Sequence, residues 1–307
     1  MTSEFMNTPR PEPRSLNGVL LLDKASGFSS NSSLQKAKRL LRARKAGHTG
    51  SLDPIASGLL PICLGEATKF SGFLLNTDKR YWVRVKLGIE TDTADIEGAV
   101  TRRLPVPELS ETLIETALAT FRGEGLQIPP MYSALKQQGR RLYELARKGI
   151  EVERAPRAIT IYDLRLEHYD ADALELNVHC SKGTYIRTLA EDLGRVLGCG
   201  GHVEILRRTA VGPLSIDQTY TIDQLEVMTD EARTAVILPV ETLVADLPKV
   251  QLTADVQVYV RRGDAVFVPQ APTADSVRLY GPESRFLGVG EVLEDGRVAP
   301  RRLIKAS

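Results

Sequence analysis

The sequence has few cysteines and no long hydrophobic run. Its three cysteines, Cys63, Cys180 and Cys199, lie far apart, form no CxxC pair and cannot all be paired in disulfides. A reducing compartment is therefore expected. No apolar run approaches the roughly 20 residues that a membrane-spanning helix needs, and no segment resembles a signal peptide. We therefore expect a cytoplasmic protein with no membrane partner.

The sequence also lacks the motifs of the common cofactor and metal sites. It has no GxxxxGK[ST] phosphate loop and no GxGxxG after a strand, so the usual cradles for nucleotide hydrolysis and dinucleotide redox chemistry are missing. The four histidines have no metal-ligand spacing among themselves or with the cysteines. We expect a protein that works without a metal or a cofactor.

Net charge is almost absent as well. The chain has 40 Lys and Arg against 39 Asp and Glu, a formal charge of +1, so a polyanionic partner has to be held by local patches. A length of 307 residues favours one large domain plus a small one. Residues 1–14 are polar and contain prolines. We expect them to be disordered or vector-derived, with a native start at Met6.

The octapeptide at 47–54, Gly-His-Thr-Gly-Ser-Leu-Asp-Pro, is the most informative segment that is present. It places Asp53 after a glycine-punctuated turn and directly before Pro54, a pattern that predicts the start of a helix. The carboxylate either caps this helix or faces a substrate. Taken alone, the segment favours the cap.

A strongly basic helix precedes the octapeptide. Residues 29–32 supply serine caps for a helix that we expect to end near Gly47. This stretch contains no acidic residue, so its cations either form a solvated face or contact phosphates. The residues assigned to this first RNA-binding patch are Lys36, Arg39, Arg42 and Lys45.

Two segments have the alternation of strands with one buried face. Residues 79–88 turn Tyr81 inward, either as a core aromatic or as a ring that lines a cleft and stacks on a base. Residues 173–180 alternate in the same way and lead into a helix. Arg187 lies in the first turns of that helix, where the helix dipole disfavours a cation. A buried carboxylate is therefore a better partner for it than Glu191 at i+4.

Two further segments differ in composition from the rest. Residues 127–156 open with two prolines and interleave aromatic with basic residues, which suits either an RNA-binding insertion or an ordinary exposed helical one. The residues of this second patch are Arg140, Arg141, Arg147 and Lys148. From about residue 249, short apolar runs such as VQVYV alternate with turn signals, which predicts a small all-β module.

Several segments together resemble the TruB family of bacterial tRNA pseudouridine synthases. The resemblance rests on LLLDKASG, on GHTGSLDPIASGLLPICLGEATK at 47–69, and then on KRYWVRVKLG, TDTADIEG and HCSKGTYIRTLAEDLG. It implies an α+β pseudouridine synthase fold over residues 15–248, with a mixed, mostly antiparallel central sheet and flanking helices. It further implies a thumb-like RNA-binding insertion at 127–156 and a PUA-like module at 249–307.

The resemblance also implies a reaction and its residues. The family isomerises uridine 55 in the T-loop of tRNA to pseudouridine, a reaction that needs no cofactor. Asp53 matches its catalytic aspartate, Tyr81 its active-site tyrosine, and Arg187 the arginine that pairs with the aspartate. The positions that match substrate-binding residues are His48, Tyr185, Leu206, Lys24 and Lys69. One departure is Ala25, which replaces the proline of the family pattern LDKPxG.

Two questions stay open at this point. A non-catalytic tRNA-binding or tRNA-folding protein on the same fold is the alternative to the enzyme. The joint presence of Asp53, Tyr81 and Arg187 favours the enzyme, because a binder has no need of an ion pair that costs desolvation. Whether Asp53 attacks C1′ or C6 of the uridine is also open. We expect the protein to be a monomer that binds the T-stem-loop of tRNA.

Overall fold

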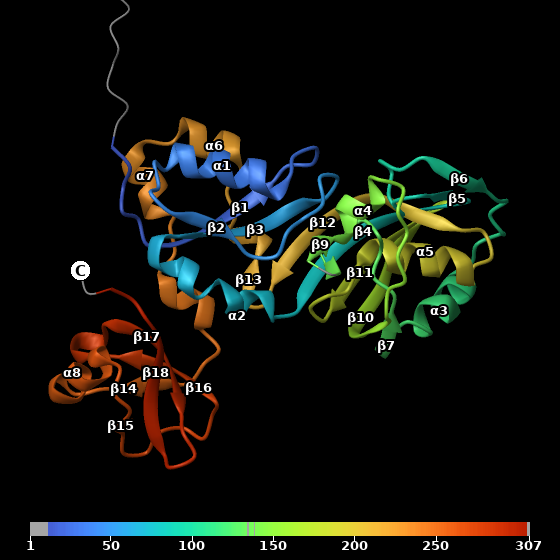
Figure 1. The fold of residues 1–307 in the computed structure, drawn as a ribbon. Helices are drawn as coiled ribbons and strands as arrows, with labels where there is room; N and C mark the ends of the chain where they lie inside the picture. The colour runs from blue at the N-terminus through green and yellow to red at the C-terminus, as the bar shows by residue number, and fades with distance from the viewer. Residues whose placement is uncertain (1–11, 134, 138, 306–307) are drawn as a thin grey trace, which may run out of the picture.

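The computed structural model describes residues 12–133, 135–137 and 139–305, and for Lys136, Gln137 and Arg141 it describes only the backbone. Of the segment 1–14 expected to be disordered, residues 1–11 lie outside the described part. Arg14 belongs to the fold, because it forms a β-bridge with Ala43 and donates a 2.9 Å hydrogen bond to Thr234 Oγ1. Figure 1 shows a large elongated body and a small body that carries the C-terminus.

A long, twisted sheet runs through the large body. In the described residues it has nine strands in the order β1-β3-β12-β4-β11-β10-β7, with β2 paired to β3 and β13 paired to β12. The strands are β1 (Gly18–Lys24), β2 (Ala46–His48), β3 (Ser57–Leu64), β4 (Lys79–Leu87), β7 (Gly123–Gln127), β10 (Arg157–Tyr169), β11 (Ala173–Cys180), β12 (Gly201–Val211) and β13 (Leu214–Ser215). Only β3 and β12 pair in parallel. The expected mixed, mostly antiparallel sheet is confirmed.

Helices flank this sheet in two groups. They are α1 (Ser30–Leu40), α2 (Ser71–Leu75), α3 (Glu111–Ala119), α5 (Ile186–Val196), α6 (Ile222–Val227) and α7 (Asp230–Ala235), with the 3-10 helices η1 (Gly65–Lys69), η2 (Ile216–Gln218) and η3 (Val240–Val244). Figure 1 shows α1, α6 and α7 together at the β1–β3 end, and α3 and α5 at the other end. A hairpin of β5 (Ile89–Thr91) and β6 (Val100–Arg103) lies beside α5.

The main core lies between the sheet and these helices. Val83 and Val85 of β4 and Leu189 and Leu193 of α5 are almost fully buried in the same apolar cluster. Each such side chain contributes about 1.5–3 kcal/mol by leaving water. The alternation of strand 79–88 and the helical spacing after residue 185 therefore have their cause in this shared core.

One predicted helix end, near Gly47, and one predicted helix start, at Asp53, are wrong. α1 ends at Leu40 and not near Gly47, because Arg42 adopts a left-handed conformation (φ 51°) that stops the helix, and Ala46–His48 forms strand β2. No helix begins at Asp53, because the apolar run that follows forms β3. This strand is paired with β1 and β12, and burial in the middle of the sheet outweighs the local capping signal.

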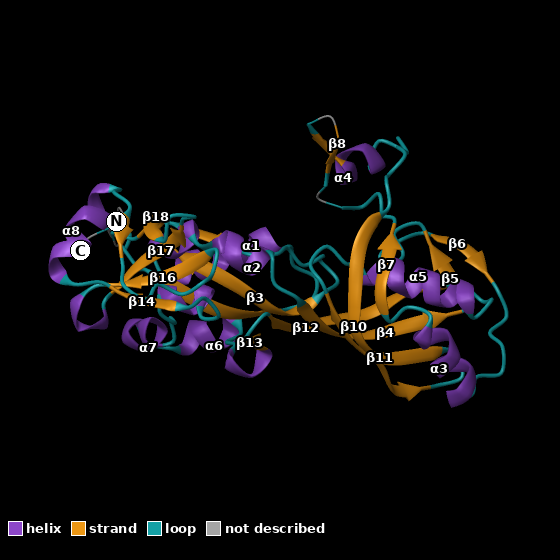
Figure 2. Cartoon of the chain, turned by 90° about the horizontal axis from the view of Figure 1, so that it is seen from below, coloured by secondary structure: helices purple, strands orange, loops and turns teal. Residues whose placement is uncertain are grey.

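The insertion between β7 and β10 stands apart from the sheet. It contains β8 (Lys136–Gln137), β9 (Arg140–Arg141) and the short helix α4 (Leu142–Ala146). In Figure 2, β8 and α4 project beyond the ends of β7 and β10. Arg140, Arg147 and Lys148 are exposed there, whereas the side chain of Arg141 lies outside the described part. The insertion is thus anchored at both ends to the central sheet.

The small body is built around a second sheet. In the described chain this sheet has five strands, β14 (Lys249–Gln251), β15 (Val266–Phe267), β16 (Ser276–Tyr280), β17 (Phe286–Val292) and β18 (Arg297–Leu303), in the order β14-β16-β17-β18-β15. The expectation of an all-β module is wrong in one respect, because VQVYV lies in helix α8 (Ala254–Arg262). Thr253 caps this helix and Gly263 ends it with φ 101°. A 3-10 turn, η4 (Pro282–Ser284), joins β16 to β17.

The two bodies share an apolar core. Cys63, Phe70 and Leu74 from the large body pack in one cluster with Tyr280 and Phe286 from the small body. The ring centroids of Phe70 and Phe286 lie 5.8 Å apart. The contact therefore crosses the expected domain boundary at residue 248, and the boundary itself stays a prediction. The described residues include no helix long and apolar enough to cross a membrane.

Candidate active site

Asp53 lies in a tightly held loop, residues 49–56, which joins β2 to β3 and is called the Asp53 loop below. Ser30, at the start of α1, donates to Leu52 O at 2.9 Å and accepts from Leu52 N at 2.7 Å. Ser26 donates to Ile55 O at 2.8 Å. These contacts fasten the loop to the β1–α1 connection. The Asp53 side chain itself remains 43% exposed and faces outward from this support.

Lys24 supports the same loop from below. Its side chain is 1% exposed, and its ammonium donates to Ala25 O at 3.0 Å, Phe28 O at 2.6 Å and Pro54 O at 3.3 Å. Burial lowers the pKa of Lys24 to about 8, while the nearby Asp53 carboxylate acts against this shift. All three N–H donors are engaged with carbonyls. Lys24 thus has a structural contact with the loop, and its expected contact with a substrate stays a prediction.

Arg187 connects Asp53 to the interior of the protein. Its Nε lies 2.9 Å from Asp53 Oδ2 and 3.7 Å from Asp95 Oδ2. Its Nη1 donates to Thr93 O at 3.0 Å and its Nη2 to Tyr132 O at 2.6 Å. The Arg187 side chain is 4% exposed, so the guanidinium is fixed on every side. The carboxylate partner expected for Arg187 is present, and the i+4 residue Glu191 bonds to Arg195 instead.

The second carboxylate, Asp95, is a site residue that the sequence reasoning missed. Its side chain is 6% exposed, and its Oδ1 accepts from Thr93 Oγ1 at 2.6 Å and from Glu97 N at 3.1 Å. A β-bridge to Val203 fixes its backbone on the central sheet. The segment TDTADIEG contains several acids, and nothing in the sequence distinguishes the one that becomes buried beside Arg187.

Tyr81, in the first half of β4, packs against the main core and lies opposite Arg208 of β12. Burial raises the pKa of Tyr81 to about 12, which Arg208 opposes and Asp53 reinforces. The phenol therefore keeps its proton in the resting protein. The ring packs on the core and lies within the electrostatic reach of Asp53, and its stacking on a base stays a prediction.

The other expected pocket residues surround this arrangement. Tyr185 precedes α5, and the Gln127 side chain holds its backbone. Tyr185 N donates to Gln127 Oε1 at 2.8 Å, and Gln127 Nε2 donates to Tyr185 O at 3.1 Å. Burial raises the pKa of Tyr185, and Asp53 adds to that shift. Leu206 of β12 is 5% exposed and pairs with β4. His48 ends β2; burial and then Arg208 lower its pKa, and its buried Nδ1 has no partner in the described residues.

Lys69 does not belong to this group, and its assignment near the pocket is wrong. It ends η1, beyond the far end of β3, whereas Asp53 precedes the near end. Eight strand residues separate the two ends, a span of about 26 Å. The Lys69 ammonium donates to Glu66 Oε2 at 2.7 Å and to Leu303 O at 2.9 Å. Lys69 is therefore a contact between the two bodies.

The first basic patch is partly neutralised by helices that are distant in sequence. Lys36 lies 3.0 Å from Glu226 of α6, and Arg42 pairs with Asp230 of α7. Arg39 and Lys45 are exposed and form no ion pair within the described chain. Only part of the predicted patch therefore keeps its cations free. In the second patch, the Arg147 guanidinium lies 5.5 Å from the ring centroid of Tyr143.

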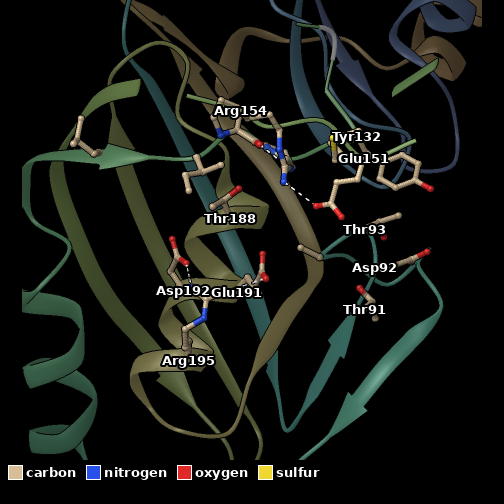
Figure 3. Close-up of a pocket in the computed structure, with 16 residues that line it drawn as sticks. Thr91, Asp92, Thr93, Tyr132, Glu151, Arg154, Thr188, Glu191, Asp192 and Arg195 are labelled. Atoms are coloured by element: carbon tan, nitrogen blue, oxygen red, sulfur yellow. Dashed lines mark hydrogen bonds and ion pairs between the residues drawn. The ribbon is translucent and has the colours of Figure 1, made fainter. Parts of the chain in front are cut away.

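A cavity of about 550 Å³ adjoins residues that bind Arg187 (Figure 3). Thr93 and Tyr132, whose carbonyls accept hydrogen bonds from Arg187, line it, but Asp53 does not. Figure 3 shows Arg154 reaching Glu151 and Arg195 reaching Asp192 on its walls. These two arginines are thus paired with carboxylates of the same walls. The candidate reactive group, the carboxylate of Asp53, lies outside this cavity.

The arrangement places one oriented carboxylate beside a neutral phenol. Arg187 fixes the direction of the Asp53 carboxylate, and Tyr81 offers a phenol that keeps its proton. Carboxylates in such settings act as covalent nucleophiles or as bases. No group of three or more His, Cys, Asp or Glu suited to a metal ion occurs among the described residues.

Three family models match successive parts of the chain. "TruB family pseudouridylate synthase (N terminal domain)" matches residues 38–186, "tRNA pseudouridylate synthase B C-terminal domain" matches residues 187–245, and "Pseudouridine synthase II TruB, C-terminal" matches residues 248–304. Among curated relatives, tRNA pseudouridine synthase B of Nitrosococcus oceani is 53% identical over 298 residues, which cover 96% of this chain and 97% of that protein. The same enzyme of Yersinia pestis (strain Pestoides F) is 51% identical over 313 residues, 98% of this chain and 96% of that protein.

Solved structures resemble the fold over nearly its whole length. The crystal structure of a Cbf5-Nop10-Gar1 complex matches with a TM-score of 0.71 and 25% identity, over 97% of this chain and 90% of that chain. The archaeal box H/ACA sRNP Nop10-Cbf5 complex matches with a TM-score of 0.70 and 24% identity, over 96% of this chain and 88% of that chain. The second likeness concerns the fold alone.

Proposed function

The chain belongs to the TruB family of pseudouridylate synthases and forms pseudouridine in tRNA, and we propose that it acts on uridine 55 of the T-loop with Asp53 as the nucleophile. The expected pseudouridine synthase fold is thereby confirmed. The observation that supports the role of Asp53 is its 2.9 Å ion pair with the buried Arg187. A cation fixed by Asp95 and two carbonyls orients the exposed carboxylate.

The reaction is a rearrangement that consumes no second substrate. The N1–C1′ bond breaks, a C5–C1′ bond forms, C5 loses its proton and N1 gains one. There is no net oxidation, so the residues have to supply only a nucleophile, a proton relay and a pocket. We propose that Asp53 forms the transient covalent bond, at C1′ or at C6.

The target base has to leave its stack to reach Asp53, at a cost of a few kcal/mol. We propose that Tyr81 and Leu206 receive the flipped uracil, with Tyr81 packing its ring on the base and Tyr185 closing the side next to α5. His48, neutral and half-buried at the end of β2, is placed to fill the space that the base leaves. In the resting protein Tyr81 keeps its proton, so it first serves as a hydrogen-bond donor. After the base has rearranged, Tyr81 gives this proton to N1 and receives the one that C5 loses, which leaves the phenol neutral again.

The RNA partner is held through phosphates. We propose that the insertion and the unpaired cations Arg39 and Lys45 contact the T-stem-loop of tRNA, since exposed cations without carboxylate partners attract a polyanion. We further propose that the protein acts as a monomer in the cytoplasm, without a metal. The three buried free cysteines are consistent with a reducing compartment.

Tritium release tests the role of Asp53. Unmodified tRNA labelled with tritium at uridine C5 loses label when C5 becomes bonded to C1′. We expect release by the natural protein and a loss of at least about 10⁴-fold in Asp53→Asn, with tRNA affinity kept within a few-fold. Asp172→Asn, which removes an exposed carboxylate paired with Lys86 at the far end of β4, is the matched control and should release tritium normally.

The same assay decides between enzyme and binder. Full activity in Asp53→Asn would refute the nucleophile, and no release by the natural protein, despite tRNA binding, would favour the non-catalytic alternative. The ion pair between Asp53 and Arg187 favours the enzyme, because a binding surface has no use for a carboxylate fixed in one direction.

A further inference from the structure

Arg208 is the largest fully buried side chain of the described protein, and it has no ion pair there. It lies in β12 with 1% of its surface exposed. Its neighbour Arg207 pairs with Asp23 at 2.6 Å, but no carboxylate contacts the Arg208 guanidinium among the described residues. Burial of a lone cation costs free energy unless its hydrogen bonds are satisfied and its charge is used.

The guanidinium instead binds two carbonyls and lies beside a phenol, in three parts of the site. Its Nε donates to Leu59 O in β3 at 2.8 Å. Its Nη2 donates to Gly50 O in the Asp53 loop at 2.8 Å. Tyr81 of β4 is the cross-strand partner of Arg208, and the Arg208 charge acts on its phenol. One side chain therefore connects the loop that carries Asp53 with the tyrosine expected to receive the base.

The backbone of Arg208 is packed as closely as its side chain. β3 and β12 run in parallel at this point, with Gly58 opposite Arg208. A Cβ at Gly58 would lie 2.3 Å from Arg208 O, and Gly58 has φ 102°, so only glycine fits there. This packing fixes the backbone of Arg208 at the point where β12 meets β3.

The Arg208–Tyr81 contact decides where the Tyr81 proton points. A guanidinium only donates, so beside its cross-strand partner Arg208 the phenol oxygen of Tyr81 can act only as an acceptor, and its own O–H is directed elsewhere. The positive charge also lowers the pKa of Tyr81, acting against burial. The charge of Arg208 also lowers the pKa values of His48, Lys24 and Lys79, and burial has the larger effect on each of them.

We propose that Arg208 is a positioning residue for pseudouridine formation: it clamps the Asp53 loop at Gly50 and turns the hydroxyl proton of Tyr81 toward the flipped uridine. This inference rests on the proposed function. Arg208 does not touch the base and acts through Tyr81 and through the loop. Its loss should slow the chemical step far more than it weakens RNA binding, because the RNA-facing cations lie elsewhere.

The test compares two substitutions of Arg208 with one of its neighbour. Arg208→Met keeps most of the volume and removes the charge and all donors, whereas Arg208→Lys keeps the charge but cannot reach three acceptors. Arg207→Met removes the adjacent, ion-paired arginine of the same strand. We expect kcat for tritium release to fall about 100-fold in Arg208→Met and about tenfold in Arg208→Lys, with tRNA affinity within a few-fold of normal. Arg207→Met should keep kcat within a few-fold.

A double-mutant cycle with Tyr81→Phe separates positioning from general support of the fold. If Arg208 acts through the Tyr81 hydroxyl, Arg208→Met and Arg208→Lys should both cost much less in the Tyr81→Phe background than alone. Circular dichroism and tRNA binding show which variants are folded. Should Arg208→Met fail to fold, the cycle with Arg208→Lys decides.

Two results would overturn the proposal. One is an Arg208→Lys variant with a kcat equal to that of Arg207→Met. The other is strict additivity of the Arg208 and Tyr81 substitutions, which would mean that Arg208 merely supports the fold. Neither result touches the proposed function, which depends on tritium release by the natural protein and its loss in Asp53→Asn.

Discussion

The two sides of the active site each contain a buried arginine, and the two arginines are used in opposite ways. On the α5 side, Arg187 lies between two carboxylates, Asp53 and Asp95. On the β12 side, Arg208 has only carbonyls and a phenol for partners. The first cation is neutralised and directs a nucleophile, whereas the second leaves its charge in the site.

The difference bears on what the site stabilises. Around Asp53 the buried cations are Arg187, Arg208 and Lys24, which exceed the paired carboxylates Asp53 and Asp95 by one (3 − 2 = 1); the carboxylate of Glu97, which also acts on Lys24, is exposed. Attack at C6 puts negative charge on the ring, and departure of the base from C1′ produces a uracil anion. A net positive pocket stabilises both. The unpaired arginine thus suits either route.

The largest expected effect comes from replacing Arg187, the arginine that lies between two carboxylates. Arg187→Met should abolish tritium release, by at least about 10³-fold, and lower the free energy of unfolding by about 3–5 kcal/mol, because it leaves Asp95 buried without a counter-charge. Adding Asp95→Asn should restore most of the stability, measured by urea unfolding, and none of the activity. A double variant as unstable as Arg187→Met would contradict the pairing of Arg187 with Asp95.

Asp95→Asn alone should have an intermediate effect. It leaves Arg187 bound to Asp53 but removes the inner carboxylate that holds the guanidinium, so kcat should fall about tenfold to 100-fold with little change in KM. Asp92→Asn changes an exposed carboxylate of the same turn that accepts a 2.8 Å hydrogen bond from Ala99 N. It serves as the control, and an equal loss in both variants would assign the effect to the turn and not to Arg187.

Lys24, which supports the Asp53 loop, makes the free energy of unfolding depend on pH. Burial lowers the pKa of Lys24 from 10.5 to about 8. Between pH 8 and 10.5 the unfolded chain therefore binds a proton that the folded protein lacks, so stability rises with pH through this window. The contribution is about 3 kcal/mol. We expect urea unfolding at pH 7.5 and pH 10 to show a smaller gain in Lys24→Met than in the natural protein.

Lys79 provides a matched comparison for Lys24. Burial also lowers its pKa to about 8, but its ammonium holds Leu74 O, Leu75 O and Thr77 O, away from the Asp53 loop. Lys79→Met should lose a similar pH-dependent stability and keep its kcat, whereas Lys24→Met should lose both. Equal kcat values in the two variants would mean that Lys24 does not support catalysis through the Asp53 loop.

The smallest expected effect lies on the basic helix. Arg39 is exposed without an ion pair in the described chain, while Lys36 is paired with Glu226. Arg39→Ala should weaken tRNA binding a few-fold and reduce the slope of log affinity against log salt by about 0.9, the value for one lost phosphate contact. Lys36→Ala should change the slope less. Equal changes would mean that Glu226 does not neutralise Lys36 in the complex.

Much of the scaffold was predictable because its signals are local. The period-two alternation of residues 79–88 and 173–180 predicted β4 and β11, and the serine caps before residue 33 predicted the start of α1. VQVYV misled, because a run of β-branched residues has strand propensity. The better signal for helix α8 was the pair of capping residues, Thr253 at its start and Gly263 at its end.

The candidate site was predictable only in part. Motifs identified Asp53, Tyr81 and Arg187 as candidates, and the structure brings Asp53 and Arg187 within 2.9 Å. Asp95 and Arg208 carry no distinguishing sequence pattern, since their importance comes from burial and from partners over 90 residues away. Lys69 was misplaced because closeness to Asp53 in the sequence says nothing about which end of β3 a residue occupies.

Short patterns of residue type and spacing are sufficient to identify the family, the type of most elements and the candidate nucleophile. The distribution of charge around Asp53, in contrast, follows from the folded arrangement. This arrangement buries Asp95 behind Arg187, leaves Arg208 without a carboxylate, and places Glu226 and Asp230 against the basic helix. Such pairings depend on distances of a few ångströms between residues far apart in the chain, and no local pattern encodes them.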